Sequence, residues 1–152
     1  MNELYLRNVT SDDCELLFDW VNNPLVRANS VNTELISLNQ HSAWFQSKLK
    51  DKNTKMYILT DGSHNIGQIR IDWIDGFWSI DYSIDSEFRG KGYGKLMVKL
   101  LTTKKILPLK ALVKKSNGPS AEIFVKIGFS CKEIILNDIP YLECIFDSKF
   151  DN

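Results

Sequence analysis

Residues Ser79 to Lys105 read SIDYSIDSEFRGKGYGKLMVKLLTTKK, and this stretch combines three kinds of local structure. Its pattern predicts a strand, then a short loop with glycine at every second position, and then an amphipathic helix. Gly90, Gly92 and Gly94 have no Cβ, so the backbone can adopt positive φ and approach a ligand closely. Because the first amides of a helix have no acceptor within it and lie at the positive end of its dipole, the loop predicts an anion site, most naturally for phosphate.

The glycine spacing separates this loop from two other phosphate loops. A dinucleotide fingerprint requires G-x-G-x-x-G with an acidic residue about 20 residues later, and a P-loop requires G-x-x-x-x-G-K-[ST]. The chain carries neither pattern, but it carries R-x-x-G-x-G on Arg89, Gly92 and Gly94. This string resembles the pyrophosphate-binding motif of the GNAT acyltransferase superfamily, whose members hold acetyl-CoA. An ordinary glycine-rich turn is the alternative interpretation of the six residues alone.

A second stretch, ALVKKSNGPSAEIFVKIGF from Ala111 to Phe129, strengthens the resemblance. It reads as a strand, an asparagine, a serine three residues later, a helix and then Gly-Phe. GNAT proteins commonly carry a block of this form after the glycine loop, in the same order and at a similar spacing. The resemblance covers about residues 65–146, and the β-α-α pattern before them also fits it.

The resemblance implies a binding site for acetyl-CoA and no metal. Backbone amides of the glycine loop would bind the pyrophosphate, and the backbone of the preceding strand would pair with the pantetheine arm. An asparagine and a serine would line the opposite wall. The residues expected at the cofactor are Tyr82, Ser83, Ile84, Arg89, Gly90, Lys91, Gly92, Tyr93, Gly94, Asn117, Ser120 and Phe124.

Direct attack of an amine on a thioester in a ternary complex needs a base for the amine and an acid for the departing thiolate. Many GNAT members carry the acid as a tyrosine in the second block, but the matching residue here is Phe124, which cannot donate a proton. Tyr82, Tyr93 or Tyr141 could serve instead. A dedicated acid is also dispensable if the thiolate leaves unaided, since a free thiol has a pKa near 8.5.

Candidates for the base are Asp81, His41 and Glu34. Together with Tyr82 as a candidate acid, the expected catalytic residues are Asp81, His41 and Tyr82. Asp81 lies on the strand beside the expected acetyl group, and a solvated strand carboxylate is its alternative interpretation. His41 titrates near neutrality unless its surroundings shift it. It follows a predicted capping box that begins at Ser37, so a surface histidine in a first helical turn is its alternative interpretation.

The sequence around His41, from Ile36 to Phe45, resembles the corresponding helix of sugar-nucleotide N-acetyltransferases in bacterial nonulosonate biosynthesis. It also resembles members that acetylate ribosomal proteins. We therefore expect the acceptor to be a primary amine of a small molecule, with a nucleotide-linked amino sugar as the leading candidate. A protein N-terminal, ribosomal-protein or polyamine N-acetyltransferase is the alternative, and a non-catalytic acyl-CoA-binding sensor is an alternative from another class.

Periodicity along the whole chain predicts an α+β fold in the order β-α-α-β-β-β-α-β-α-β-β. This corresponds to a mixed, mostly antiparallel sheet of about seven strands with about four helices. Residues 25–36 are polar and irregular, and they predict a loop. Asn22, Asn23 and Pro24 are expected to end the first helix.

Composition bounds the remaining properties. A chain of 152 residues predicts one domain, over residues 1–152. A net charge of zero does not indicate a nucleic-acid partner. The sequence has no long apolar run, so we expect no signal peptide and no membrane partner. Three widely spaced cysteines without a secretory signal predict reduced thiols and a cytoplasmic protein. The resemblance implies a possible homodimer through the C-terminal strands, and residues 148–152 are expected to form a frayed tail.

Overall fold

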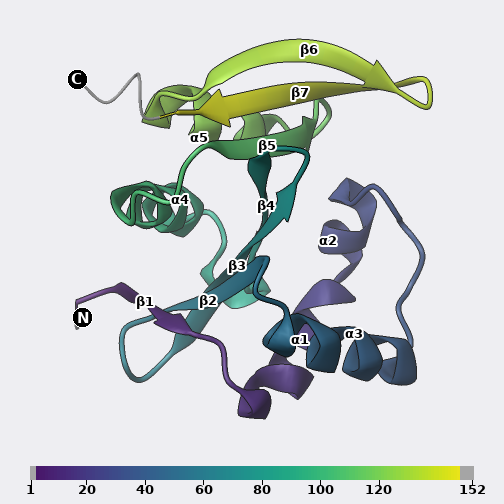
Figure 1. The fold of residues 1–152 in the computed structure, drawn as a ribbon, viewed down its shortest axis with the longest axis vertical. Coiled ribbons are helices and arrows are strands. Elements are labelled where there is room, and N and C mark those ends of the chain that lie inside the picture. The colour runs from purple at the N-terminus through teal and green to yellow at the C-terminus, as the bar shows by residue number, and fades with distance from the viewer. Residues whose placement is uncertain (1–2, 148–152) are drawn as a thin grey trace.

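The computed structural model of the chain describes residues 3–147, so the expected tail at residues 148–152 lies outside the described part. A seven-stranded sheet forms its centre, in the order β1-β2-β3-β4-β5-β7-β6 (Figure 1). Only β4 and β5 run parallel; the other neighbours are antiparallel, which confirms the predicted fold class. The strands are β1 (Tyr5–Asn8), β2 (Thr54–Thr60), β3 (Asn65–Ile74), β4 (Phe77–Ile84), β5 (Leu109–Lys114), β6 (Ser130–Leu136) and β7 (Ile139–Phe146).

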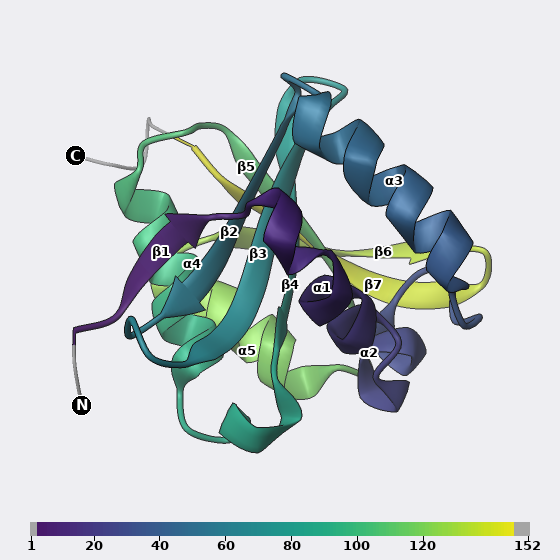
Figure 2. The same ribbon diagram turned by 90° about the horizontal axis from the view of Figure 1, so that it is seen from below.

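Helices cover both faces of this sheet. Helices from the first third of the chain lie on one face, and helices from its second half lie on the other (Figures 1 and 2). Within residues 3–147 no helix is long and apolar enough to cross a membrane. The helices are α1 (Cys14–Val21), α2 (Pro24–Asn29), α3 (Leu38–Lys50), α4 (Tyr93–Thr103) and α5 (Gly118–Ile127), with single 3₁₀ turns at Ser11–Asp13 and Ser86–Phe88.

Helix α2 corrects the prediction of a loop over residues 25–36. Asn23 begins this helix, because its Oδ1 accepts a hydrogen bond from the amide of Leu25 at 3.0 Å, and Pro24 occupies the first helical position. Proline there costs no hydrogen bond, and asparagine is a favoured N-cap. Asn23 and Pro24 therefore separate two helices, where the sequence pattern indicated only the end of one. Six residues are too few for an apolar stripe to reveal the second helix.

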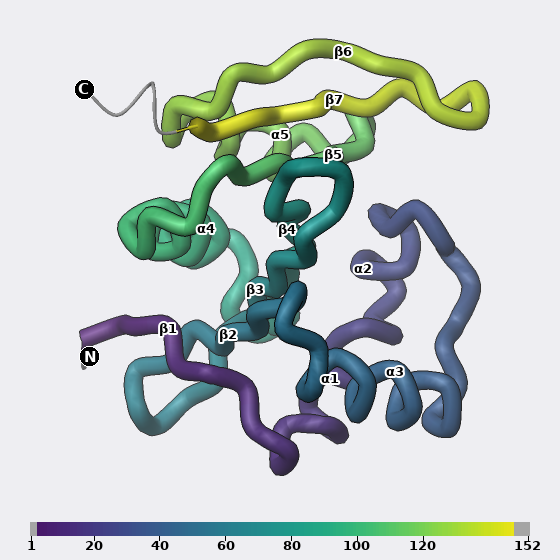
Figure 3. Tube along the Cα trace, in the orientation of Figure 1, coloured from purple at the N-terminus to yellow at the C-terminus, as the bar shows by residue number. Residues whose placement is uncertain are grey.

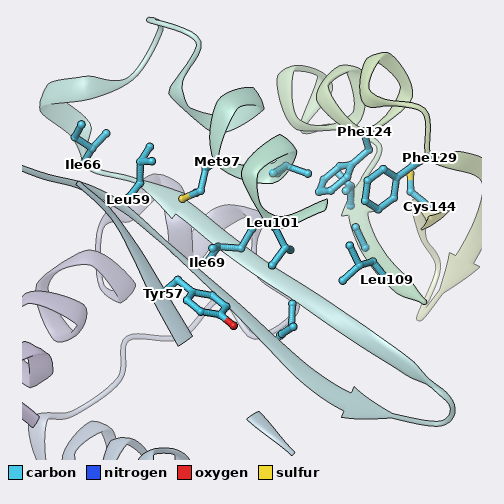
Figure 4. Close-up of a cluster of buried hydrophobic side chains, with 14 residues drawn as sticks. Tyr57, Leu59, Ile66, Ile69, Met97, Leu101, Leu109, Phe124, Phe129 and Cys144 are labelled. Atoms are coloured by element: carbon cyan, nitrogen blue, oxygen red, sulfur yellow. The ribbon is translucent and has the colours of Figure 1, made fainter. Parts of the chain in front are cut away.

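The larger part of the core lies between the sheet and the helices α4 and α5. Met97, Leu101 and Phe124 from these helices are almost fully buried against strand residues such as Ile69 and Leu109 (Figure 4). A smaller cluster on the other face joins α1 and α3 to β2. The sheet is thus held firmly to α4 and α5, while α1–α3 form a lighter layer on the opposite face.

Strands β4 and β5 pair only over their first residues. Their register runs from Trp78 opposite Leu109 to Ile80 opposite Ala111, and within residues 3–147 no strand pairs with β4 on this side beyond Ile80. On its other edge β4 remains paired with β3 up to Ile84. Figure 3 shows the traces of β3 and β4 next to each other at the centre of the molecule. The second half of β4 therefore presents one backbone edge to a gap between two parallel strands.

The cysteines differ from the expectation of reduced thiols. Cys131 and Cys144 form a disulfide between β6 and β7, while Cys14 is free. The two residues lie directly opposite each other in the antiparallel register, a relation that the prediction of the hairpin did not fix. The expectation is therefore wrong for this pair, and their burial in or beside the core is as predicted.

Candidate active site

The glycine loop lies between the end of β4 and the start of α4, as the sequence predicts. Gly90 and Gly92 adopt positive φ values of 75° and 84°, and Gly92 is the N-cap residue of α4. A Cβ at either glycine would meet no other described atom within 4 Å. Because the opening amides of a helix have no acceptor within it, this open space beside two left-handed glycines can receive an anion.

Arg89 ties the loop to neighbouring elements. Its Nε donates to the carbonyl of Ile84 at 3.1 Å, and its Nη2 donates to Oδ1 of Asn23 at 3.1 Å. Asn23 is also the N-cap residue of α2. A second link lies close by, since Trp20 Nε1 donates to Oδ2 of Asp85 at 2.8 Å. The glycine loop is thereby joined by side chains to the helices on the opposite face of the sheet.

The wall across the gap comes from the start of α5. Asn117 is the N-cap residue of this helix, but its side chain makes no capping hydrogen bond. Ser120 is buried, and its Oγ lies 2.6 Å from the hydroxyl oxygen of Tyr82 on β4. Phe124 is 1% exposed, and its ring packs edge-on against Tyr82 at 5.9 Å between centroids. Burial raises the pKa of the Tyr82 hydroxyl, although its hydrogen bond with Ser120 lowers it in part.

A cavity of about 380 Å³ lies on the other face of the sheet, beneath α1–α3. Two cross-strand pairs contribute to its lining: Gln68 with Ser83, and Arg70 with Asp81. Trp44 of α3 also lines it, and the guanidinium of Arg70 lies over the ring of Trp44 at 4.9 Å from its centroid. Polar side chains, aromatic rings and one carboxylate therefore meet on the face that α4 and α5 do not cover.

Asp81 is the single carboxylate that lines this cavity among the described residues. Its Oδ2 accepts from Gln68 Nε2 at 3.1 Å and lies 3.6 Å from Arg70 Nη1. The side chain is still 53% exposed, so it remains open to a ligand. Because alternate residues of a strand point to opposite faces, Asp81 faces the cavity while Tyr82 faces α5. A carboxylate and a phenol thus flank the open edge of β4.

Family comparison supports this geometry. The acetyltransferase (GNAT) domain family matches residues 3–130, which is most of the chain. The chain belongs to the GNAT acetyltransferase family. It is therefore an acetyl-CoA-dependent N-acetyltransferase, with acetyl-CoA as its co-substrate. No curated protein sequence gives a significant match.

Solved structures share the GNAT fold at low sequence identity. Spermidine N-acetyltransferase from Vibrio cholerae, in complex with CoA and spermine, has a TM-score of 0.85 and 15% identity over 98% of both chains. AAC(6')-Ib in complex with ribostamycin and coenzyme A has a TM-score of 0.83 and 19% identity, over 99% of this chain and 97% of that one. RimL, a ribosomal L7/L12 alpha-N-protein acetyltransferase in complex with coenzyme A, has a TM-score of 0.81 and 16% identity, over 97% and 95%. At these identities the likeness shows the fold alone.

The GNAT domain brings some predicted catalytic residues together and separates others. Asp81 and His41 both line the cavity, whereas Glu34 is exposed on the segment before α3 and does not. His41 is 3% exposed, and its Nε2 lies 3.0 Å from the carbonyl of Cys14 in α1. Burial lowers the pKa of His41, and this hydrogen bond opposes the shift in part. Its observed contact joins two helices, so its role as a base stays a prediction.

Several residues of this GNAT site were not found from the sequence. Gln68 holds Asp81, and its alternation with Arg70 along β3 could have placed it on the same face. Arg27 lines the cavity from α2, but no local pattern marked a helix there. The links from Trp20 and Asn23 to the glycine loop join residues about 65 positions apart, and no single-sequence signal identifies such pairs.

Side chains that could ligate a metal do not cluster in the part of the chain that the structure describes. Within residues 3–147 no group of three or more histidine, cysteine, aspartate or glutamate residues could hold a metal ion. The GNAT site described above combines backbone amides with hydroxyl, amide, aromatic and guanidinium side chains and one carboxylate.

Proposed function

We propose that this GNAT acetyltransferase acetylates the primary amine of a small acceptor by direct attack on acetyl-CoA in a ternary complex. The best candidate for the acceptor is a nucleotide-linked amino sugar. The two sides of β4 support this arrangement, because the glycine loop and gap lie toward α4 and α5 and the cavity lies toward α1–α3. The amine and the thioester would then meet at the open edge of β4.

The side of β4 that faces α4 and α5, here called the donor side, has groups that would bind the pyrophosphate and the pantetheine arm of acetyl-CoA. Residues 89–94 would bind the pyrophosphate with their amides. The unpaired edge of Tyr82, Ser83 and Ile84 would hydrogen-bond the amides of the pantetheine arm. Asn117 and Ser120 would line the facing wall. These assignments rest on the matched motif and on the gap.

Asp81 would accept the proton of the attacking amine. A base must lie within hydrogen-bond reach of the proton that it takes, and Asp81 is the carboxylate that the cavity offers. Gln68 and Arg70 hold one of its oxygens and leave the side chain half exposed. An ammonium group bound by Asp81 loses its proton and becomes the neutral nucleophile that attack on the thioester requires.

The charge of the cavity is the observation that favours a neutral or anionic acceptor. Its lining carries two guanidinium groups, on Arg27 and Arg70, and one carboxylate, on Asp81. Arg70 is paired with Asp81 and with Asp72, so the cation without a counter-charge is Arg27. Arg27 is 9% exposed and donates to the carbonyls of Val21, Asn32 and Glu34, not to a carboxylate. A buried cation without a counter-charge repels further cations. A polyamine with several ammonium groups would be bound poorly, whereas a phosphate-bearing amino sugar would be attracted.

The same assay tests four alternatives. The structures with a similar fold include a spermidine N-acetyltransferase bound to spermine, a ribosomal-protein N-acetyltransferase and AAC(6')-Ib bound to an aminoglycoside, and each of these ligands represents a candidate acceptor class here. A non-catalytic acyl-CoA-binding sensor is the alternative from another class, because Phe124 lacks the hydroxyl of the usual acid. The resemblance around His41 and the cavity charge favour the amino sugar. A homodimer through the C-terminal strands also stays a proposal.

An acceptor panel tests the proposal. The purified protein is incubated with acetyl-CoA and, in separate reactions, UDP-linked amino sugars, the free amino sugars, spermidine, kanamycin and N-terminal peptides, while thiol release is measured. We expect kcat/KM for the best UDP-linked amino sugar to exceed that for spermidine at least about tenfold, since each favourable charge contact is worth about 1.4 kcal/mol or more. Turnover with peptides or spermidine alone would contradict the acceptor, and acetyl-CoA binding without turnover would favour the sensor.

A further inference from the structure

The hydroxyl pair of Tyr82 and Ser120 is the feature of the site that the proposed function has not used. Their oxygen atoms lie 2.6 Å apart, a short distance even for two hydroxyl groups. Tyr82 comes from β4, two residues beyond the last residue that pairs with β5, and Ser120 comes from the first turn of α5. The pair therefore bridges the strand and the helix on either side of the gap.

Strand geometry places this pair opposite the base. Asp81 and Tyr82 are consecutive on β4, so their side chains point to opposite faces. Asp81 lines the cavity with Gln68 and Arg70, while Tyr82 packs against Phe124 and near Gly94. A thioester held at the open edge of β4 would have the carboxylate on the side from which the amine arrives and the phenol on the other.

We propose that Tyr82 is the general acid that protonates the sulfur of coenzyme A, and that Ser120 is the positioning residue that orients the phenol. This inference rests on the proposed acetyl transfer. The amine nitrogen forms a bond to the carbonyl carbon, the C–S bond breaks, and its electron pair goes to sulfur. Tyr82 gives its proton to that sulfur while the Ser120 hydroxyl donates to the phenol oxygen. Asp81 takes the ammonium proton and releases it to solvent, and the phenol regains the second amine proton through solvent.

The chemistry of the two hydroxyls decides which one is the acid. A phenol has an ordinary pKa near 10, close to that of a thiol, whereas a serine hydroxyl is a far weaker acid. Tyr82 is protonated at neutral pH, since burial raises the pKa of its phenol above an ordinary value that is itself well above neutrality.

Packing explains how a tyrosine on β4 can take the role of the acid that many GNAT proteins carry on the helix corresponding to α5. Phe124 occupies the position where many GNAT proteins carry a tyrosine, and it is fully enclosed in the core. Its ring meets the ring of Tyr82 edge-on, so the two aromatic side chains share one part of the gap. A Cβ at Gly94 would lie 3.5 Å from Cε2 of Tyr82, in ordinary contact. Tyr141 is a weaker candidate because it lies on β7, two strands away from β4.

Two single variants and a double variant test this assignment with whichever amine the wild-type protein acetylates. Tyr82→Phe should lower kcat about 100-fold, the usual effect of removing a general acid, while the Kd of acetyl-CoA changes less than about twofold. Ser120→Ala should lower kcat about tenfold, because the phenol stays but loses its orientation. In the double variant both hydroxyls are gone, so neither is left without its partner. We expect its melting temperature to recover toward that of the wild type and its kcat to stay low.

A rescue variant separates the catalytic role from a structural one. Adding Phe124→Tyr to Tyr82→Phe returns one hydroxyl to the same pair of rings, and we expect it to restore at least about tenfold of the lost kcat. Wild-type kcat in Tyr82→Phe, or a kcat in the double variant that recovers together with its melting temperature, would overturn the inference and leave the proposed function standing. Absence of turnover by the wild-type protein with every amine would overturn the proposed function first.

Discussion

The two sides of β4 are built in different ways. On the donor side, consecutive residues of one loop supply backbone amides, and the glycine spacing that frees them is visible in a six-residue string. On the acceptor side, side chains from α1, α2, α3, β3 and β4 converge on one cavity, and Leu17 of α1 and Ser83 of β4 lie 66 positions apart in the chain. A site made of backbone leaves a local signature in the sequence, while a site made of side chains depends on how distant elements pack.

The largest expected effect tests whether the donor side depends on its backbone. Gly92→Val places a branched side chain at a φ of 84° and fills the open space before α4. We expect the Kd of acetyl-CoA to rise about 100-fold or more, because the pyrophosphate would lose contacts worth about 3 kcal/mol. Isothermal titration with acetyl-CoA measures this loss.

Gly76→Val is the matched control for this strain. Gly76 lies in the β3–β4 hairpin with a φ of 86°, and a Cβ there would also meet no described atom within 4 Å. Both variants should lose about 1–3 kcal/mol of unfolding free energy, since valine is strained in this backbone region. Only Gly92→Val should lose acetyl-CoA binding. An unchanged Kd in that variant would refute the assignment of the loop.

A second prediction asks whether the acceptor side acts independently of the donor side. Asp81→Asn keeps the shape of the side chain and removes its capacity to accept a proton. We expect kcat to fall about 100-fold, at the lower end of the range for a general base, and the Kd of acetyl-CoA to stay the same. Asp75→Asn, at the tip of the β3–β4 hairpin, is the control that removes a remote carboxylate. If Asp81→Asn weakened acetyl-CoA binding as strongly as it lowered kcat, the two sides would not be separate sites.

Most of the fold could be predicted from the sequence, because the patterns that indicate its strands and helices are local. Alternation, glycine turns and caps predicted seven strands, and the structure has seven strands in that order along the chain. Helix α2 was missed because six residues carry no periodic pattern, and a single proline both follows α1 and begins α2. The pairing of Cys131 with Cys144 was missed for another reason: it depends on the register of β6 and β7, which a strand pattern alone does not specify.

The same distinction explains the site. Arg89, Gly92 and Gly94 were predicted from spacing, and the structure places them at the start of α4. Asp81 was named as a candidate, but its face was open until the register with Arg70 was known. Arg27 was not predicted as a site residue, because its position in the cavity depends on how the helix α2 packs. The acceptor side is therefore the part of the molecule whose chemistry the sequence predicts least.

The smallest expected effect concerns how the acceptor side is held together. His41 joins α3 to α1 through its contact with the Cys14 carbonyl, and burial lowers its pKa below the ordinary value of 6.5. The unfolded chain thus binds the proton more readily than the folded one. This contribution to the unfolding free energy is complete above about pH 6.5 and is lost as the pH falls through 6.5 toward the folded pKa. Between about pH 7.5 and 5.5, where carboxylates remain ionised, we expect the melting temperature of the wild-type protein to fall.

Two variants show whether His41 causes this fall. In His41→Gln the amide can still donate to the Cys14 carbonyl but cannot be protonated, so the fall should be smaller than in the wild-type protein. His64→Gln removes the other histidine, which lies in the turn between β2 and β3 and pairs with Asp61, and it serves as the control. The Kd of acetyl-CoA should stay constant over the same pH range, because the glycine loop is built from backbone groups that do not titrate. A pH-dependent melting temperature that persists unchanged in His41→Gln would show that another group controls the stability of the acceptor side.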